Sequence, residues 1–127
     1  METNLNYSIL IVDDEKTNLN VLNHTLHREY VVYMARDGKT AIEIASDYLP
    51  DLILLDIIMP DMDGYEVISV LKSSEITKDI PVIFITGLDS SEDLEKGMAL
   101  GAADYISKPF SATILKDKVS KHIKKDL

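Results

Sequence analysis

Five residues with side chains capable of chemistry stand at the ends of short apolar runs in the sequence. They are Asp13, Asp14, Asp56, Thr86 and Lys108. Three carboxylates brought into one crevice raise one another's pKa or recruit a cation. Mg²⁺ is the natural cation, since it prefers oxygen ligands and takes one or two carboxylates together with a phosphate. The sequence has no cysteine and no histidine cluster that would favour a softer metal.

The same residue types can carry out phosphoryl transfer. A carboxylate can attack phosphorus and form an aspartyl phosphate, and Asp56 fits this role. Asp14, with Asp13, fits the role of metal ligand. Lys108 can neutralise the oxygens of the transferred group, and the Thr86 hydroxyl can donate a hydrogen bond to one of them.

Each of these residues also has a simpler interpretation when it is taken alone. The acidic pair could form a strand-to-helix turn in which Asp14 caps the helix, and Asp56 could be a turn residue before Pro60. Lys108 could be an ordinary surface residue, and Thr86 could be a packed strand residue. The joint placement of all five favours a site.

Short apolar runs alternate with amphipathic segments along the whole chain. Leu19, Leu22 and Leu26, for example, recur at helical spacing. Ser90, Gly101 and Ser111 stand at expected helix ends. The pattern predicts strands over 7–12, 30–35, 51–55, 80–86 and 103–107, and helices over 15–28, 39–49, 64–74, 90–101 and 111–127.

This order is a strand–helix unit repeated five times, which predicts an α/β fold. Several strands are continuous apolar runs, and such runs indicate burial on both faces of a parallel sheet covered by helices. All strands of a parallel sheet end at the same edge, where ligands bind. The chemically capable residues are therefore expected to meet there.

Length, composition and charge limit the function classes. We expect one domain over residues 1–127 with a core of about 8–125. There is no signal peptide pattern and no apolar run near the about 20 residues of a membrane span, so we expect a cytoplasmic chain without membrane contact. The net charge of −9 disfavours direct binding to nucleic acid.

The sequence resembles the receiver domains of two-component response regulators. The motifs that carry the resemblance are "ILIVDDE" (9–15), "DLILLDIIMPDMDGYEVI" (51–68), "PVIFITG" (81–87) and "GAADYISKPF" (101–110). They occur in order and span nearly the whole chain. The resemblance implies a flavodoxin-like (βα)5 fold, a doubly wound sheet with strand order 2-1-3-4-5.

The resemblance also implies roles for individual residues. Asp56 is expected to be the phospho-acceptor, and Mg²⁺, with Mn²⁺ as an alternative, would be bound by Asp14, Asp56 and the backbone carbonyl of Ile58, with Asp13 acting indirectly. Thr86 and Tyr105 match the switch pair, and Lys108 matches the family's lysine, followed by a cis peptide to Pro109. Gly64 matches a turn glycine for which a positive φ is expected.

The implied function is a signalling switch, not a turnover enzyme. A sensor histidine kinase or histidine phosphotransfer protein would donate the phosphoryl group. The face formed by residues 90–101, 103–107 and 111–127 would then change, and it is the expected place for a homodimer. Two alternatives are a docking module that never takes phosphate and a Mg²⁺-dependent phosphatase with an aspartyl nucleophile. The phosphatase needs an acidic residue at position 58, where this chain has Ile58.

Some further residues lead to separate expectations. Ile58 and Leu88 are apolar where many family members are polar, which suggests slow loss of the phosphoryl group. His24 and His27 could bind a metal but are expected to be surface residues, and His122 is expected to face solvent. The lysines near the end of the chain are expected to be solvated, with a partner-binding surface as the alternative; they are Lys116, Lys118, Lys121, Lys124 and Lys125.

Overall fold

The computed structural model describes residues 6–88 and 90–123 of the chain. The strands are β1 (Ser8–Val12), β2 (Val31–Ala35), β3 (Leu52–Leu55), β4 (Val82–Thr86) and β5 (Asp104–Ser107). The helices are α1 (Lys16–Leu26), α2 (Gly38–Tyr48), α3 (Gly64–Ser73), α4 (Ser91–Ala99) and α5 (Ala112–Ile123). Every predicted element is present, and none of the described helices is long and apolar enough to cross a membrane.

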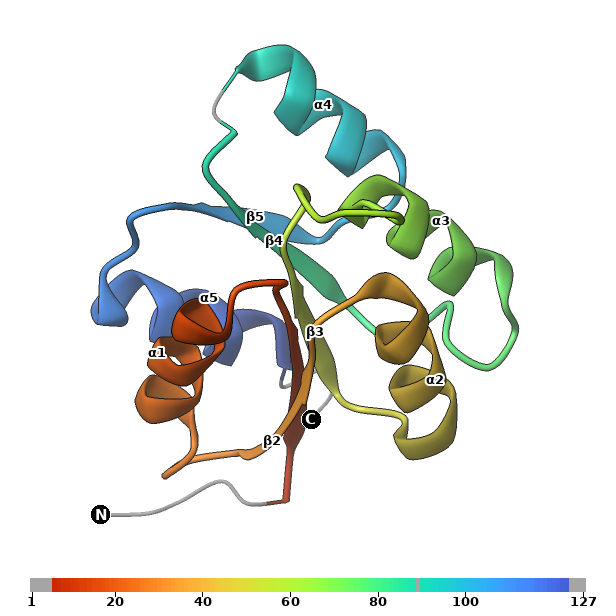
Figure 1. Cartoon of the computed structure of the whole chain (residues 1–127). Coiled ribbons are helices and arrows are strands. Elements are labelled where there is room, and N and C mark those ends of the chain that lie inside the picture. The colour runs from red at the N-terminus through yellow and green to blue at the C-terminus, as the bar shows by residue number, and fades with distance from the viewer. Residues whose placement is uncertain (1–5, 89, 124–127) are drawn as a thin grey trace.

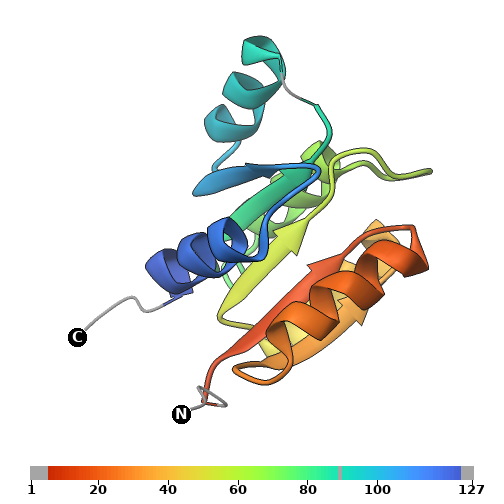
Figure 2. The same cartoon turned by 90° about the vertical axis from the view of Figure 1, so that its left-hand side faces the viewer.

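The strands form one parallel sheet in the order β2-β1-β3-β4-β5. Figure 1 shows α1 and α5 on one side of this sheet and α2 and α3 on the other, with α4 at the top. Figure 2, turned by 90°, shows α1 and α5 in front of the sheet. The predicted doubly wound (βα)5 fold and its strand order 2-1-3-4-5 are therefore confirmed.

Two apolar layers make up the core, and β1 contributes to both of them. Leu10 and Val12 pack with α2 and α3, whereas Ile9 and Ile11 pack with α1 and α5. Successive residues of a strand point to opposite faces of a sheet, so an uninterrupted apolar run fills both layers. This is why the central strands lack polar alternation.

The helix starts follow local capping chemistry. Asp63 accepts a hydrogen bond from the Glu66 backbone N–H at 2.9 Å, and the Glu66 side chain bonds back to the Asp63 N–H at 3.0 Å. Ser90 and Ser111 cap α4 and α5 as predicted, with side-chain oxygens 3.1 Å from the backbone nitrogens of Asp93 and Ile114. These caps fix where each helix leaves the site edge of the sheet.

Candidate functional site

The β1–α1 connection places the acidic pair at the carboxyl edge of the sheet. Asp13 is fully buried, and its Oδ1 accepts a hydrogen bond from the Glu15 backbone N–H at 3.0 Å. Its Oδ2 accepts from Asn18 at 3.2 Å. The N-cap of α1 is Glu15 and has no side-chain cap, so the alternative role of Asp14 as a helix cap is wrong. Asp13, not Asp14, organises this turn.

Asp56 follows β3 and faces the same crevice. Its backbone N–H donates to the Val12 carbonyl at 3.0 Å, which ties it to the end of β1. The side chain is buried, because the residue is only 6% exposed. The carboxylates of Asp13, Asp14 and Asp56 offer oxygens that all lie within 4.8 Å of one another. Among the described residues this is the one group of three or more acidic or histidine side chains so arranged.

Lys108 completes the cluster from the end of β5. Its Nζ lies 3.0 Å from Asp13 Oδ2 and 3.3 Å from Asp56 Oδ2. Burial lowers the pKa of Lys108, but hydrogen bonds and attraction from the two carboxylates outweigh it and raise the pKa above 10.5. Lys108 therefore stays charged between the carboxylates. The peptide to Pro109 is cis, as expected.

The protonation of Asp56 is set by opposing influences. Burial raises its pKa, the Lys108 cation lowers it, and the Asp13 charge raises it, so the net pKa lies above 3.8. One cation thus faces three carboxylates. A hard divalent ion fits this donor set, because it would supply the missing positive charge and prefers oxygen ligands.

Thr86 and Tyr105 lie on the two strands beyond β3. Thr86 is fully buried, and its Oγ1 accepts a hydrogen bond from the Leu88 backbone N–H at 3.1 Å. Its carbonyl accepts from the Lys108 N–H at 2.8 Å, which couples it to the site lysine. Tyr105 is half-buried and packs against the same core layer as Leu88. The predicted switch residues therefore lie on adjacent strands, with Thr86 at the edge of the sheet that carries Lys108.

Gly64 is required at the site for a reason other than the expected one. A positive φ is predicted for it, but among the described residues the positive φ angles belong to Leu49, Asp61 and Gly101. A Cβ on Gly64 would lie 2.5 Å from the Asp56 carbonyl oxygen and 2.7 Å from Ile57 Cα. Close packing of α3 against the backbone of Asp56, not backbone strain, excludes a side chain there.

With the fold and the cluster established, relatives identify the family. A model of the response regulator receiver domain matches residues 9–120. The chain belongs to this family. Receiver domains are parts of two-component signal transduction, and this chain has their parallel sheet and their acidic edge.

Two curated relatives are longer proteins, and this chain matches a part of each. A probable cyclic di-GMP phosphodiesterase of Vibrio cholerae is 47% identical over 116 residues, which are 91% of this chain and 26% of that protein. The response regulator PleD of Caulobacter vibrioides is 44% identical over 108 residues, which are 84% of this chain and 24% of that protein. This receiver domain spans about a quarter of the length of these relatives.

Solved receiver structures agree with the fold. The receiver domain of the sensor histidine kinase PA1611 of Pseudomonas aeruginosa has a TM-score of 0.87 at 29% identity and covers 94% of this chain and 98% of that one. It is described with a magnesium ion coordinated in the active site cleft. The chemotaxis protein CheY4 of Vibrio cholerae has a TM-score of 0.87 at 30% identity, with 91% and 98% covered.

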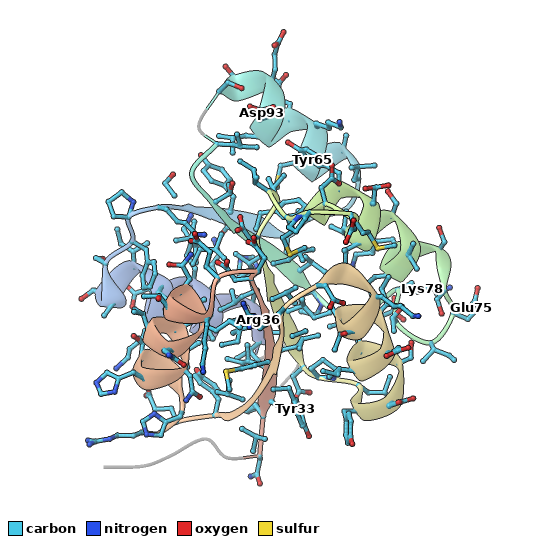
Figure 3. The ribbon with its side chains drawn as sticks, in the orientation of Figure 1. Tyr33, Arg36, Tyr65, Glu75, Lys78 and Asp93 are labelled. Atoms are coloured by element: carbon cyan, nitrogen blue, oxygen red, sulfur yellow. The ribbon has the colours of Figure 1, made fainter. Side chains whose placement is uncertain are left out.

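Several features of this receiver domain lie outside the sequence-based predictions. Asn18 contacts Asp13, and Arg36 donates a hydrogen bond to the Asp14 carbonyl at 3.1 Å; Arg36 is labelled in Figure 3. Asn18 lies in the first turn of α1, three residues after the N-cap Glu15, so a position near the acidic turn could have been predicted for it, but nothing in the sequence pairs residues 14 and 36. The side chain of Ile58 extends outward and is 60% exposed.

The prediction for His122 was wrong. Its Nε2 lies 3.0 Å from Asp104 Oδ2, and its side chain is only 19% exposed. Lys118 also bonds Asp104, at 3.1 Å, so this lysine of the C-terminal group is held within the domain. Lys116 and Lys121 are exposed as expected, and Lys124 and Lys125 lie outside the described residues.

Proposed function

We propose that this receiver domain is a phosphorylation-controlled switch that accepts a phosphoryl group on Asp56. The observation that carries the proposal is the position of the Lys108 ammonium, within hydrogen-bond distance of both Asp13 and Asp56. A buried carboxylate beside a fixed cation at a sheet edge has the surroundings that an acceptor for phosphorus needs. We take the receiver domain as a single unit with a core of about 8–125.

The donor is a phosphohistidine on a sensor histidine kinase or a histidine phosphotransfer protein. An oxygen of Asp56 attacks phosphorus and forms a P–O bond while the P–N bond breaks. The departing imidazole nitrogen keeps the electron pair and takes up a proton. Lys108 balances charge on the phosphoryl oxygens, and Thr86 donates its hydroxyl hydrogen to one of them.

Mg²⁺ would be held by Asp14, Asp56 and the Ile58 carbonyl, with Asp13 acting indirectly. The metal would neutralise the charge on the oxygens of the transferred group, and Mn²⁺ has the same ligand preference.

Asp13 also has a positioning role. Its two oxygens bond Glu15, Asn18 and Lys108, so it orients the turn that carries Asp14 and fixes the lysine. Its full burial supports this positioning role.

The response proceeds from Thr86 to the surface. When Thr86 turns toward the phosphoryl group, it gives up the bond to the Leu88 N–H and leaves space that Tyr105 can fill. The face formed by α4, β5 and α5 then changes shape, and two copies of the domain can meet there. This is a two-state element biased by one local charge. We place the process in the cytoplasm, with protein partners and without direct contact to nucleic acid or membrane.

Exposure to a small phosphodonor with Mg²⁺, followed by intact-mass measurement, tests the function. One phosphoryl adduct that is present in the parent and absent in Asp56→Asn supports the switch. Continuous release of phosphate without a lasting adduct on Asp56 would make the domain an aspartyl-nucleophile phosphatase instead. If no adduct forms at any concentration of donor or metal, the domain is a docking module that is not phosphorylated.

A further inference from the structure

Helix α4 is attached to the domain differently from the other helices. Each of the helices α1, α2, α3 and α5 buries at least three residues against the sheet. The one buried residue of α4 is Gly97, which has no side chain to contribute. Leu94 is half-buried, Met98 is 45% exposed, and the C-cap residue Leu100 packs against the core layer from the end of the helix. Burial of apolar side chains is the main source of helix docking energy, so α4 gains less of it than the other helices and depends more on other contacts.

Gly97 allows α4 to come close to an aromatic ring. A Cβ at this position would lie 2.7 Å from Phe84 Cε2 and 2.9 Å from Phe84 Cδ2. Real Cβ atoms do not approach carbon atoms so closely, because such contacts are repulsive. Glycine weakens the interior of a helix, so its presence in α4 is explained by this contact with β4.

Tyr65 of α3 provides further contacts with α4. Its hydroxyl donates a hydrogen bond to the Asp93 carbonyl at 3.1 Å. The Lys96 ammonium lies 4.3 Å from the centre of its ring, and the ring meets Phe84 edge-on with 5.9 Å between centroids. Tyr65 and Asp93 are labelled in Figure 3, where α3 approaches α4. One side chain therefore touches α4 at two points and also the strand beneath it.

We infer that Tyr65 is a positioning residue that holds α4 against α3 and β4, so that α4 detaches locally when the Tyr65 contacts are lost. The inference stands on contacts in the unphosphorylated domain. It rests on the proposed switch in one respect: α4 follows the loop that begins after Thr86, so Tyr65 would set how easily phosphorylation moves that face. A local opening of this kind is measurable as amide hydrogen exchange.

Tyr65→Phe is the decisive variant, because it keeps the ring and removes only the hydroxyl that bonds Asp93. Without any phosphodonor, we expect amides of α4 to exchange roughly 3- to 10-fold faster, as the loss of one hydrogen bond predicts. Amides of β1 and β3 should not change. Ser69→Ala is the matched control, since it also removes a hydroxyl from α3, one that bonds only the Tyr65 carbonyl at 2.9 Å.

A merely stabilising role for Tyr65 would give another result, in which all slowly exchanging amides accelerate together and urea unfolding shifts equally. That result, or α4 exchange in Tyr65→Phe equal to that in Ser69→Ala, overturns the inference. Gly97→Ala supplies a second variant, which displaces α4 at the Phe84 contact and should accelerate the same amides. If Gly97→Ala slows or leaves unchanged the exchange of α4, the proposed docking is wrong.

The experiment distinguishes failure of this inference from failure of the proposed function. Tyr65 has no contact with Asp56 or Lys108 among the described interactions, so phosphoryl uptake should stay within about twofold of the parent in Tyr65→Phe. If the amides of α4 exchange faster in Tyr65→Phe but the domain takes up no phosphoryl group, the inference is supported and the proposed switch function is wrong. If amide exchange is unchanged but the domain does take up a phosphoryl group, only the inference is wrong.

Discussion

The Lys108 ammonium lies 3.3 Å from Asp56 Oδ2, although β4 stands between the strands that carry these two residues. The lysine reaches across that strand and also contacts Asp13 at the end of β1. Strand order reverses between β1 and β3, the place where open α/β sheets bind ligands. The ion pair therefore connects the far edge of the sheet to its binding crevice.

Lys108→Met should reduce both the rate of phosphoryl uptake and the stability of the folded domain. We expect the rate of phosphorylation by a small phosphodonor to fall about 100-fold or more, because one fixed charge on the transferring group is lost. The free energy of unfolding, measured in urea at pH 7 without Mg²⁺, should fall by about 3 kcal/mol, because Asp13 and Asp56 stay buried without their cation.

Lys116→Met is the matched control for this variant. Its ammonium lies 3.6 Å from Glu29 with both side chains more than a third exposed, so its loss should cost less than about 1 kcal/mol. A Lys108→Met domain that is phosphorylated at the parental rate would show that the lysine plays no part in the transfer.

Asp56→Asn should make the domain more stable at neutral pH. Burial raises the pKa of Asp56, Lys108 lowers it and Asp13 raises it, and the net value is above 3.8. The folded domain thus holds this proton more tightly than the unfolded chain. The stability contributed by the group is full below pH 3.8 and is lost as the pH rises through the folded-state pKa. At pH 7 without metal the amide should gain on the order of 1 kcal/mol.

Urea unfolding of parent and Asp56→Asn between pH 3.5 and 8 measures this gain. The difference between them should grow with pH, since the amide resembles the protonated acid. Asp47→Asn, an exposed site on α2, should show no such difference. A gain that is the same at all pH values would contradict the assignment to Asp56 ionisation.

The sequence-based predictions succeeded where one local pattern determines the answer. All strands and helices begin and end within a few residues of the predicted bounds, because apolar runs and caps such as Ser90 are local signals. The convergence of Asp13, Asp56 and Lys108 follows from a single topological rule. Their roles in phosphoryl transfer stay predictions.

The failures concern contacts between segments that no sequence pattern pairs. His122 was expected to face solvent, but its side chain contacts Asp104 of β5. It lies beside the buried face of α5, which is formed by Leu115, Val119 and Ile123. The close contact of Gly64 with the Asp56 carbonyl depends on how α3 packs. The sequence can suggest that a glycine is required at a position. It does not reveal whether the requirement comes from a positive φ angle or from a lack of space for a side chain.

Asp104→Asn should destabilise the attachment of α5 to β5. Burial raises the pKa of Asp104, but hydrogen bonds from the Tyr105 backbone, His122 and Lys118 outweigh it, so the pKa lies below 3.8. The stability that this group contributes is present above pH 3.8 and is lost as the pH falls through the folded-state pKa. The amide should therefore cost up to about 1 kcal/mol at pH 7, since the pair is partly exposed.

The cost should shrink toward acid pH, and urea unfolding at pH 7 and pH 3 measures it. Asp117→Asn on the exposed side of α5 is the control and should change little at either pH. An equal loss at both pH values would mean that the contacts of Asp104 do not depend on its charge.

Ile58→Asn should speed the loss of the phosphoryl group from Asp56. Family resemblance suggests that the residue two positions after the acceptor flanks the path of an attacking water, and an apolar side chain cannot orient that water. Because Ile58 is 60% exposed, the substitution should leave the core intact. We expect the first-order loss in Mg²⁺ without a partner to rise roughly 3- to 10-fold, the effect of one added hydrogen bond.

Leu88→Glu tests the same idea at the second apolar position but is the weaker variant. Leu88 is partly buried against the core layer that contains Phe84, so a carboxylate there would also lower stability. Ile58→Val separates polarity from shape, since it shortens the side chain without adding a polar atom and should leave the rate of loss unchanged. Equal rates for Ile58→Asn and Ile58→Val would show that water access to Asp56 is controlled elsewhere, and the explanation for a long-lived phosphoryl group would then fail.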